Sequence, residues 1–204
     1  ILKLTEVDSG SIIFNKNEIT KLSSSQMKII RKDMQIIFQD PFGSLNPRHS
    51  IKTILSEPLI VHNYGDKLKI NKRITELLDQ VSLPQKSLDL YPHEFSGGQR
   101  QRIAIARALS LNPKFLIADE AVSALDVSIQ SQIINLISDI LKEYRISMIF
   151  ISHDLSVIKH ISTKIAVMNK GKIIEIGDTK ETLRNPKQKY TKLLISSVPG
   201  MKLN

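Results

Sequence analysis

Cysteine is absent from the 204 residues, which excludes a disulfide framework, a thiol nucleophile and a cysteine-ligated zinc or iron–sulfur site. Aromatic residues are scarce, at 5%, so few side chains are available for stacking on nucleic-acid bases. The net charge of +9 comes from scattered lysines, a pattern typical of a solvated surface, and we expect no nucleic-acid partner. No apolar run approaches the roughly 18 residues of a membrane span, and the first residues lack the layout of a signal peptide.

A phosphate-binding loop of the pattern Gly-x-x-x-x-Gly-Lys-Ser/Thr is also missing. The amides and the lysine of such a loop hold the β- and γ-phosphates of a nucleotide. The only Gly-Lys pair here is Gly171-Lys172, and Ala166 stands where the first glycine of the loop would be. These residues therefore do not encode a nucleotide cradle of that kind.

The segment Ser96-Gly97-Gly98-Gln99 organises the rest of the chain. Ser96 and Gln99 have the spacing of a capping box, in which the serine side chain accepts from the amide near Gln99 and the glutamine reaches back, so a helix begins here. Gly97 and Gly98 have no side chains, which lets an anion approach the first-turn amides and the positive end of the helix dipole. We predict that this segment binds phosphate.

An apolar run from Lys114 to Ala118 precedes two adjacent carboxylates, Asp119 and Glu120. Such a run predicts a parallel strand that is buried on both faces and has functional groups at its carboxyl end. Neighbouring strand residues point to opposite faces, which suits one carboxylate to a magnesium shell and the other to a water molecule.

A second strand is predicted from Met34 to Phe38 and stops at Gln39, because Pro41 cannot donate to a strand ladder. From Phe42 to Leu111 the pattern is mostly helical. One apolar face at helical spacing contains Ile70, Ile74, Leu77, Leu78 and Val81.

The remaining pattern predicts a helix, a strand and a hairpin. Asp126 has the character of an N-cap for a helix whose broad apolar face begins at Val127. A buried strand from Ile146 to Ile151 would deliver His153 to its carboxyl end. Residues 164–176 have the alternation and the central turn of a β-hairpin.

The order of these features is Ser-Gly-Gly-Gln, a helix, a strand ending in Asp-Glu, Ser123-Ala124-Leu125-Asp126 and Ser152-His153-Asp154. This order resembles the nucleotide-binding subunit of ABC transporters, over about residues 12–199. The resemblance implies an α/β fold: a P-loop NTPase-like ABC nucleotide-binding domain with an inserted helical subdomain, lacking its N-terminal strands and phosphate loop. It divides a partial ATP-binding domain, 1–204, into a helical subdomain with the signature motif (42–111), a core with Walker B, D-loop and H-loop (112–177) and a C-terminal peptide-importer-like element (178–204).

The resemblance also implies ATP and Mg²⁺ as cofactors and ATP hydrolysis coupled to transport as the reaction. The implied catalytic residues are Glu120, which would orient or deprotonate the attacking water, and His153, which would contact the γ-phosphate. Asp119 and Gln39 would bind the magnesium, partly through water. Two implied elements face a second ATPase subunit, namely the signature motif for the partner's ATP (Ser96, Gly97, Gly98, Gln99) and the dimer-seam loop (Asp126).

Some segments resemble the oligopeptide/dipeptide importer branch more narrowly. They are Ser44-Leu45-Asn46-Pro47-Arg48, Glu57-Pro58-Leu59, residues 185–191 and Ser197-Val198-Pro199. The chain departs from that branch at Gln188-Lys189, where His-Pro is usual, and in lacking a cysteine-bearing tail. The implied partners are membrane permease subunits and a second ABC ATPase subunit, identical or different, and the implied location is the cytoplasmic face of the cell membrane, as a peripheral protein.

Ile1-Leu2-Lys3-Leu4 reads as the end of a helix, so we expect these residues to come from a longer subunit that carries the phosphate loop. Two alternatives stay open: a natural chain that lacks the loop and acts in trans through Ser96–Gln99, or an inactive remnant. A soluble ABC ATPase acting on DNA or ribosomes would share these motifs, but the coiled-coil insertions or tandem cassette usual in that class are not visible.

Overall fold

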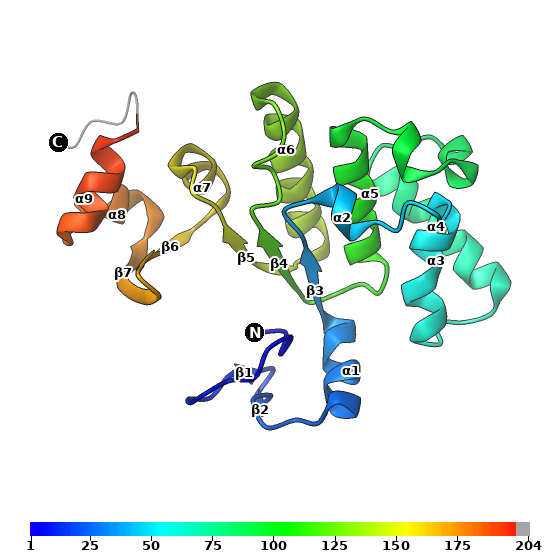
Figure 1. The fold of residues 1–204 in the computed structure, drawn as a ribbon, viewed down its shortest axis with the longest axis horizontal. Helices are drawn as coiled ribbons and strands as arrows, with labels where there is room; N and C mark the ends of the chain where they lie inside the picture. Colours follow the sequence, from blue (N-terminus) through cyan, green and yellow to red (C-terminus); the bar gives the residue numbers. More distant parts are fainter. Residues whose placement is uncertain (199–204) are drawn as a thin grey trace. The chain divides into compact units, whose positions relative to one another are not determined.

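The computed structural model describes residues 1–198, and these divide into two compact units between Ile149 and Phe150 (Figure 1). Most of the expected site residues, from Gln39 to Asp126, belong to the first unit, and His153 belongs to the second. The division at 42–111, 112–177 and 178–204 stays a prediction. Among residues 1–198, no helix combines the length and the apolar character needed to cross a bilayer.

The first unit begins with a hairpin and a helix. These elements are β1 (Ile13–Phe14), the antiparallel β2 (Asn17–Glu18) and α1 (Ser24–Asp33). The prediction that Ile1–Leu4 ends a helix is wrong, because these residues are not helical and Lys3 has a φ of 52°. Leu2 instead lies buried in an apolar cluster with Met27 and Met34, so tertiary packing places this segment.

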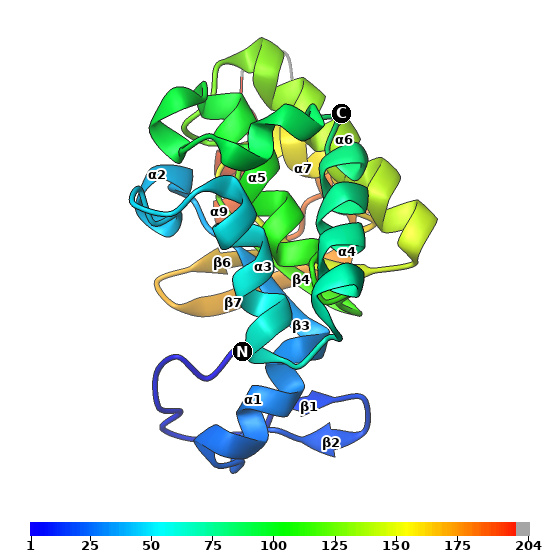
Figure 2. The ribbon, with the colours of Figure 1, turned by 90° about the vertical axis from the view of Figure 1, so that its right-hand side faces the viewer.

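Helices dominate the stretch between the first two strands of the main sheet. They are α2 (Pro41–Ser44), α3 (Ile51–Val61), α4 (Lys67–Gln80), the 3₁₀ helices Gln85–Asp89 and Pro92–Glu94, and α5 (Gly97–Leu109). Figures 1 and 2 show α2, α3 and α4 gathered around α5. The predicted apolar face is confirmed at Ile74, Leu77, Leu78 and Val81, which are all buried.

The main sheet contains parallel strands. Its elements are β3 (Met34–Ile37), β4 (Phe115–Asp119) and β5 (Ser147–Ile151), in the order β3-β4-β5, with α6 (Val127–Tyr144) in the connection between β4 and β5. β3 and β4 are in register, with Met34 opposite Phe115 and Ile37 opposite Ala118. The parallel register brings the carboxyl ends of β3 and β4 to the same edge of the sheet.

Two predictions about burial in this region are wrong. Val127, expected on the apolar face of α6, is 78% exposed, because it is the first helical residue and the buried face begins further along at Ile133. β5, expected to be buried, alternates between exposed and half-buried residues, and Ile149 and Ile151 are 39% and 46% exposed. As the last strand in the described order, β5 has a described neighbour on one side only.

The second unit is built on a hairpin with helices before and after it. Its elements are α7 (Leu155–Ile161), β6 (Lys164–Asn169), β7 (Lys172–Asp178), α8 (Thr179–Arg184) and α9 (Lys189–Ser196). The hairpin confirms the prediction, and its turn has positive φ at Lys170 and Gly171, as a two-residue turn requires. Ile158, Ile165 and Val167 form the buried cluster of this unit. The importer-like Pro199 lies outside the described residues.

Candidate functional site

The structure brings together two predicted site residues that are 81 positions apart in the sequence. Gln39 follows β3 and Glu120 follows β4, and the parallel register places both at one edge of the sheet. The Nε2 atom of Gln39 donates a hydrogen bond of 2.8 Å to Oε2 of Glu120. A hydrogen bond to a carboxylate is stronger than one between neutral groups, so this contact orients the Glu120 side chain.

Glu120 has a left-handed backbone conformation, with a φ of 46°. This conformation is uncommon outside glycine, and such residues concentrate at functional sites. Ser123 holds the turn, because its amide and its hydroxyl each donate a 3.0 Å hydrogen bond to the Glu120 carbonyl. The backbone turn, and not the pleat of the strand, therefore sets the direction of Glu120.

Asp119 is the last residue of β4 and is exposed. Adjacent residues of a strand point to opposite faces, but Glu120 lies beyond β4, so this alternation does not set its direction relative to Asp119. That the two carboxylates serve a metal and a water separately stays a prediction.

Magnesium is a hard cation that prefers oxygen ligands and keeps several of its own waters. Asp119, Glu120 and Gln39 carry carboxylate and carboxamide oxygens, so their chemistry fits this ion. Among the residues that the structure describes, no group of three or more His, Asp or Glu side chains is placed to bind a metal ion. That these oxygens bind magnesium stays a prediction.

The helix start predicted at Ser96 is confirmed as a complete capping box. The Gln99 amide donates to Ser96 Oγ at 3.4 Å, and the Ser96 amide donates to Gln99 Oε1 at 3.0 Å. α5 begins directly after Ser96, so its first turn carries Gly97 and Gly98. Phosphate binding at this turn stays a prediction.

Gly98 has a packing role that the sequence did not predict. A Cβ atom added to Gly98 would lie 2.5 Å from Cγ2 of Ile129 in α6, whereas one added to Gly97 would lie an ordinary 3.6 Å from the Leu125 side chain. The absence of a side chain at Gly98 is therefore also a packing requirement. The signature segment lies against the segment that contains Asp126.

Asp126 is the N-cap of α6, as predicted. Its Oδ1 accepts hydrogen bonds from the Ile129 amide at 3.0 Å and from the Ser128 hydroxyl at 2.7 Å. These bonds stabilise the charged carboxylate and lower the pKa of Asp126, with the Ile129 amide making the largest contribution. The side chain of Asp126, the proposed dimer-seam residue, is thus held in place by hydrogen bonds within its own chain.

His153 lies in the second unit, between the end of β5 and the start of α7. Its neighbour Asp154 is the N-cap of α7, and the Ser156 amide donates to Asp154 Oδ1 at 2.8 Å. A hydrogen bond from the Ser156 hydroxyl is the main cause of the lowered pKa of Asp154. The contact of His153 with a γ-phosphate stays a prediction.

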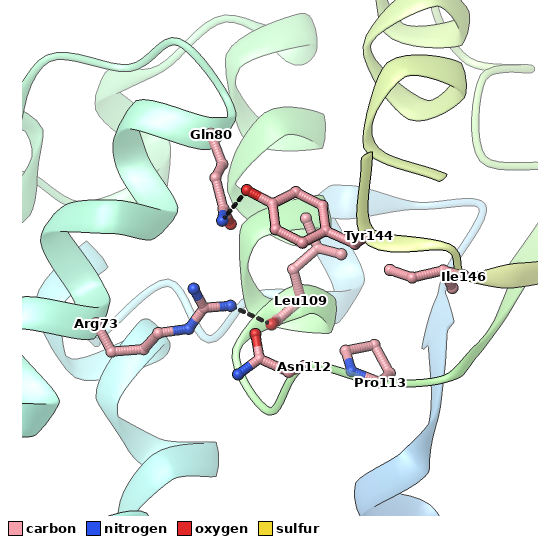
Figure 3. A pocket seen from close by; sticks show the side chains of 7 residues that line it. All are labelled: Arg73, Gln80, Leu109, Asn112, Pro113, Tyr144 and Ile146. Atoms are coloured by element: carbon pink, nitrogen blue, oxygen red, sulfur yellow. Dashed lines mark hydrogen bonds between the residues drawn. The ribbon is translucent and has the colours of Figure 1, made fainter. Parts of the chain in front are cut away.

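A cavity of about 130 Å³ lies at the other end of α5 from Ser96 (Figure 3). There the buried guanidinium of Arg73 donates to the carbonyls of Leu109 at 2.8 Å and Ser110 at 3.2 Å. Gln80 Nε2 also donates to the Tyr144 hydroxyl at 2.7 Å. A cation bound to the last carbonyls of a helix stabilises its C-terminus, so we assign this cluster a structural role.

Comparisons with curated proteins find relatives among bacterial import proteins. The glutathione import ATP-binding protein GsiA of Pectobacterium atrosepticum is 49% identical over 199 residues, which cover 98% of this chain and 32% of GsiA. The oligopeptide transport ATP-binding protein AppF of Bacillus subtilis is 48% identical over 200 residues, which cover 98% of this chain and 61% of AppF. The chain therefore spans less than two thirds of the length of these relatives.

Solved structures and a family model agree with the relatives. A dimeric post-hydrolysis state of the ATP-binding cassette MJ0796 bound to ADP and Pi has a TM-score of 0.76 and 26% identity, covering 86% of this chain and 76% of that one. The structure of cbiO1 from Clostridium perfringens, part of the ABC transporter complex cbiONQ, has a TM-score of 0.78 and 28% identity, covering 95% and 79%. The model described as "ABC transporter" matches residues 1–123, more than half of the chain. The chain belongs to the ABC transporter family, and its sequence is that of an ATP-binding domain of this family.

Proposed function

We propose that these residues belong to the ATP-hydrolysing subunit of an ABC importer for peptides. The observation that supports this most directly is the 2.8 Å hydrogen bond between Gln39 and Glu120. A carboxylate oriented in this way can position a water molecule and accept its proton as the water attacks the γ-phosphate of ATP. Glu120 is therefore the proposed general base, and Gln39 is the residue that orients it.

The other site residues have supporting parts in this proposal. Asp119 would bind magnesium, partly through water, and the bound ion would neutralise charge on the phosphate oxygens. His153 would donate to the γ-phosphate as it is transferred. We assign these roles to Asp119 and His153 from the chemistry of their side chains and from their positions at or just after the carboxyl end of a strand.

The signature segment would act on a nucleotide held by a second ATPase subunit. The first turn of α5 presents backbone amides near the positive end of the helix dipole, which favours an anion. The solved cassette MJ0796 is described as dimeric, which supports the proposal that this chain also pairs with a second ATPase subunit. Asp126, whose segment packs beside Gly97 and Gly98, would then lie at the seam between the two subunits.

The proposed substrate class is peptides, either short oligopeptides or glutathione. This rests on the names of GsiA and AppF and on the importer-like segment from Ser44 to Arg48. An importer subunit would bind membrane permease subunits at the cytoplasmic face of the membrane, where ATP-dependent changes of conformation can be passed on.

The test is uptake by the complete subunit assembled with its permease in liposomes. We expect ATP hydrolysis together with ATP-dependent uptake of labelled glutathione or of a labelled pentapeptide. Hydrolysis without uptake of either compound would overturn the peptide assignment. A complete absence of hydrolysis by the assembled complex would overturn the ATPase assignment as well.

A further inference from the structure

The short helix α2 begins two residues after Gln39, so its placement affects the position of the Gln39 side chain. Asp40 is the N-cap of α2 and accepts a 2.8 Å hydrogen bond from the Phe42 amide. The Leu45 amide closes the helix by donating to the Pro41 carbonyl at 3.3 Å. A helix of a single turn has little stability of its own, so tertiary contacts must hold it in place.

Two arginines of α5 supply such contacts. The guanidinium carbon of Arg100 lies 3.6 Å from the centre of the Phe42 ring, and Arg107 Nη1 donates to the Ser44 carbonyl. Arg100 and Arg107 are seven positions apart, about two helical turns, and therefore lie on one face of α5. Figures 1 and 2 show α2 beside α5 in both views.

Arg100 is itself held by the loop that leads into the signature segment. Its side chain is largely buried, with 8% of the residue exposed, and its Nε donates to the Pro92 carbonyl at 2.6 Å. A further bond of 3.3 Å joins Nη2 to the His93 carbonyl. These two bonds fix the guanidinium plane relative to the loop before Ser96, independently of its contact with Phe42.

Phe42, by contrast, is 60% exposed, so burial contributes little to holding its ring. The contact with Arg100 is a cation–π interaction in which one partner is largely removed from water, the condition under which such interactions are strongest. Contacts therefore link the signature loop to Phe42 through Arg100, and the backbone of residues 39–42 links Phe42 to Gln39, which bonds to Glu120.

We propose that Arg100 and Phe42 form a positioning contact that ties the Gln39–Glu120 pair to the signature segment. Arg100 acts through α2, because its side chain contacts the Pro92 and His93 carbonyls and the Phe42 ring. The inference rests on the proposed function, because it assigns the contact a part in ATP hydrolysis.

The test is a double-mutant cycle in the complete subunit, using Phe42→Leu and Gln39→Ala and measuring kcat and KM for ATP. Phe42→Leu keeps an exposed apolar side chain, so the protein should fold. We expect Phe42→Leu to lower kcat about fivefold with KM within about twofold, and to have no further effect when Gln39 is already alanine. Equal effects in both backgrounds, or none in the wild type, would overturn the proposal.

A matched control is Tyr64→Leu, which removes another cation–π contact, in which Lys69 Nζ lies 5.1 Å from the centre of the Tyr64 ring. Any effect of Tyr64→Leu should be the same with and without the Gln39 side chain.

A second measurement separates failure of this inference from failure of the proposed function. Amide hydrogen exchange in residues 39–45 needs no activity and can be followed in the complete subunit without nucleotide. Phe42→Leu should speed exchange in this segment about threefold or more, because the one-turn helix loses a tertiary contact. Unchanged exchange in Phe42→Leu would reject the positioning contact, even if the wild-type subunit hydrolyses ATP. Faster exchange would support the contact, even if the wild-type subunit does not hydrolyse ATP.

Discussion

The two proposed nucleotide-binding elements of the first unit are held in opposite ways. The signature segment is ordered by hydrogen bonds between Ser96 and Gln99, which are three residues apart. The Gln39–Glu120 pair is ordered by a hydrogen bond across 81 residues and by a parallel register between β3 and β4. The bonds of the local element join residues that are close together along the chain, whereas those of the non-local pair exist only in the packed fold.

This difference predicts where each element is sensitive. A local cap survives changes elsewhere in the protein, and its loss costs about 1 kcal/mol. A non-local pair depends on everything that places its two strands, and a displacement of about 1 Å can reduce catalysis about a hundredfold.

The largest effect should come from Glu120→Gln, which keeps the shape of the side chain but removes the proposed base. We expect ATP hydrolysis by the complete subunit to fall about a hundredfold or more, with nucleotide affinity retained. Steady-state hydrolysis and equilibrium nucleotide binding measure the two quantities. Glu18→Gln, at an exposed position in β2, is the control, and a Glu120→Gln enzyme with near-normal hydrolysis would remove Glu120 from the mechanism.

Gly98→Ala should destabilise the fold, because the added Cβ would lie 2.5 Å from Ile129. Overpacking of this kind costs about 1–3 kcal/mol, so the midpoint of urea unfolding should fall. Gly97→Ala is the matched control, since its Cβ would lie 3.6 Å from Leu125, and it should change the free energy of unfolding by less than about 0.5 kcal/mol. Equal costs at the two glycines would show that the packing against α6 is looser than we describe.

Ser96→Ala should cost about 1 kcal/mol of stability, the usual value for a lost N-cap. Ser96→Asp should restore most of that loss, because a carboxylate also accepts the Gln99 amide and suits the start of a helix. The same carboxylate would repel a phosphate, so we expect ATP hydrolysis by Ser96→Asp to be lower than by the wild type. Recovery of both stability and hydrolysis would mean that Ser96 is a cap and has no contact with nucleotide.

The smallest effect should be the pH dependence due to Asp126. Its pKa is lowered from the usual 3.8 in the folded state, so its contribution is present above that value and is lost as the pH falls through the folded pKa. The wild type should therefore be more stable than Asp126→Asn at neutral pH, and the difference should shrink in acid. Urea unfolding at pH 7 and pH 3 measures this, and a constant difference would contradict the assignment of the lowered pKa.

Local patterns in the sequence predicted several elements well. The capping box at Ser96, the N-cap at Asp126, the buried face of α4 and the hairpin of β6 and β7 are all present in the structure. The caps and the turn of the hairpin depend on residues within about one turn of each other, and the face of α4 follows from the periodic spacing of its apolar residues, so the amino-acid order is enough to predict them. The motif order also identified the family, which the comparisons confirm.

Burial and long-range contacts were predicted less well. Leu2 was expected in a helix and lies instead in a packed cluster, and the strand β5 is more exposed than its apolar sequence suggests. Sequence reasoning missed the arginines that hold α2, although their seven-residue spacing on α5 is the signal that could have found them.

The helix caps and the candidate site residues can be identified from the amino-acid order, because a cap depends on residues three positions apart and the motifs are contiguous. The packed fold is needed to show that Gln39 bonds to Glu120, that Gly98 lies against Ile129 and that Arg100 lies over Phe42. Those contacts join residues tens of positions apart, and their geometry depends on strand register and helix packing. Spacing along the chain does not encode that geometry.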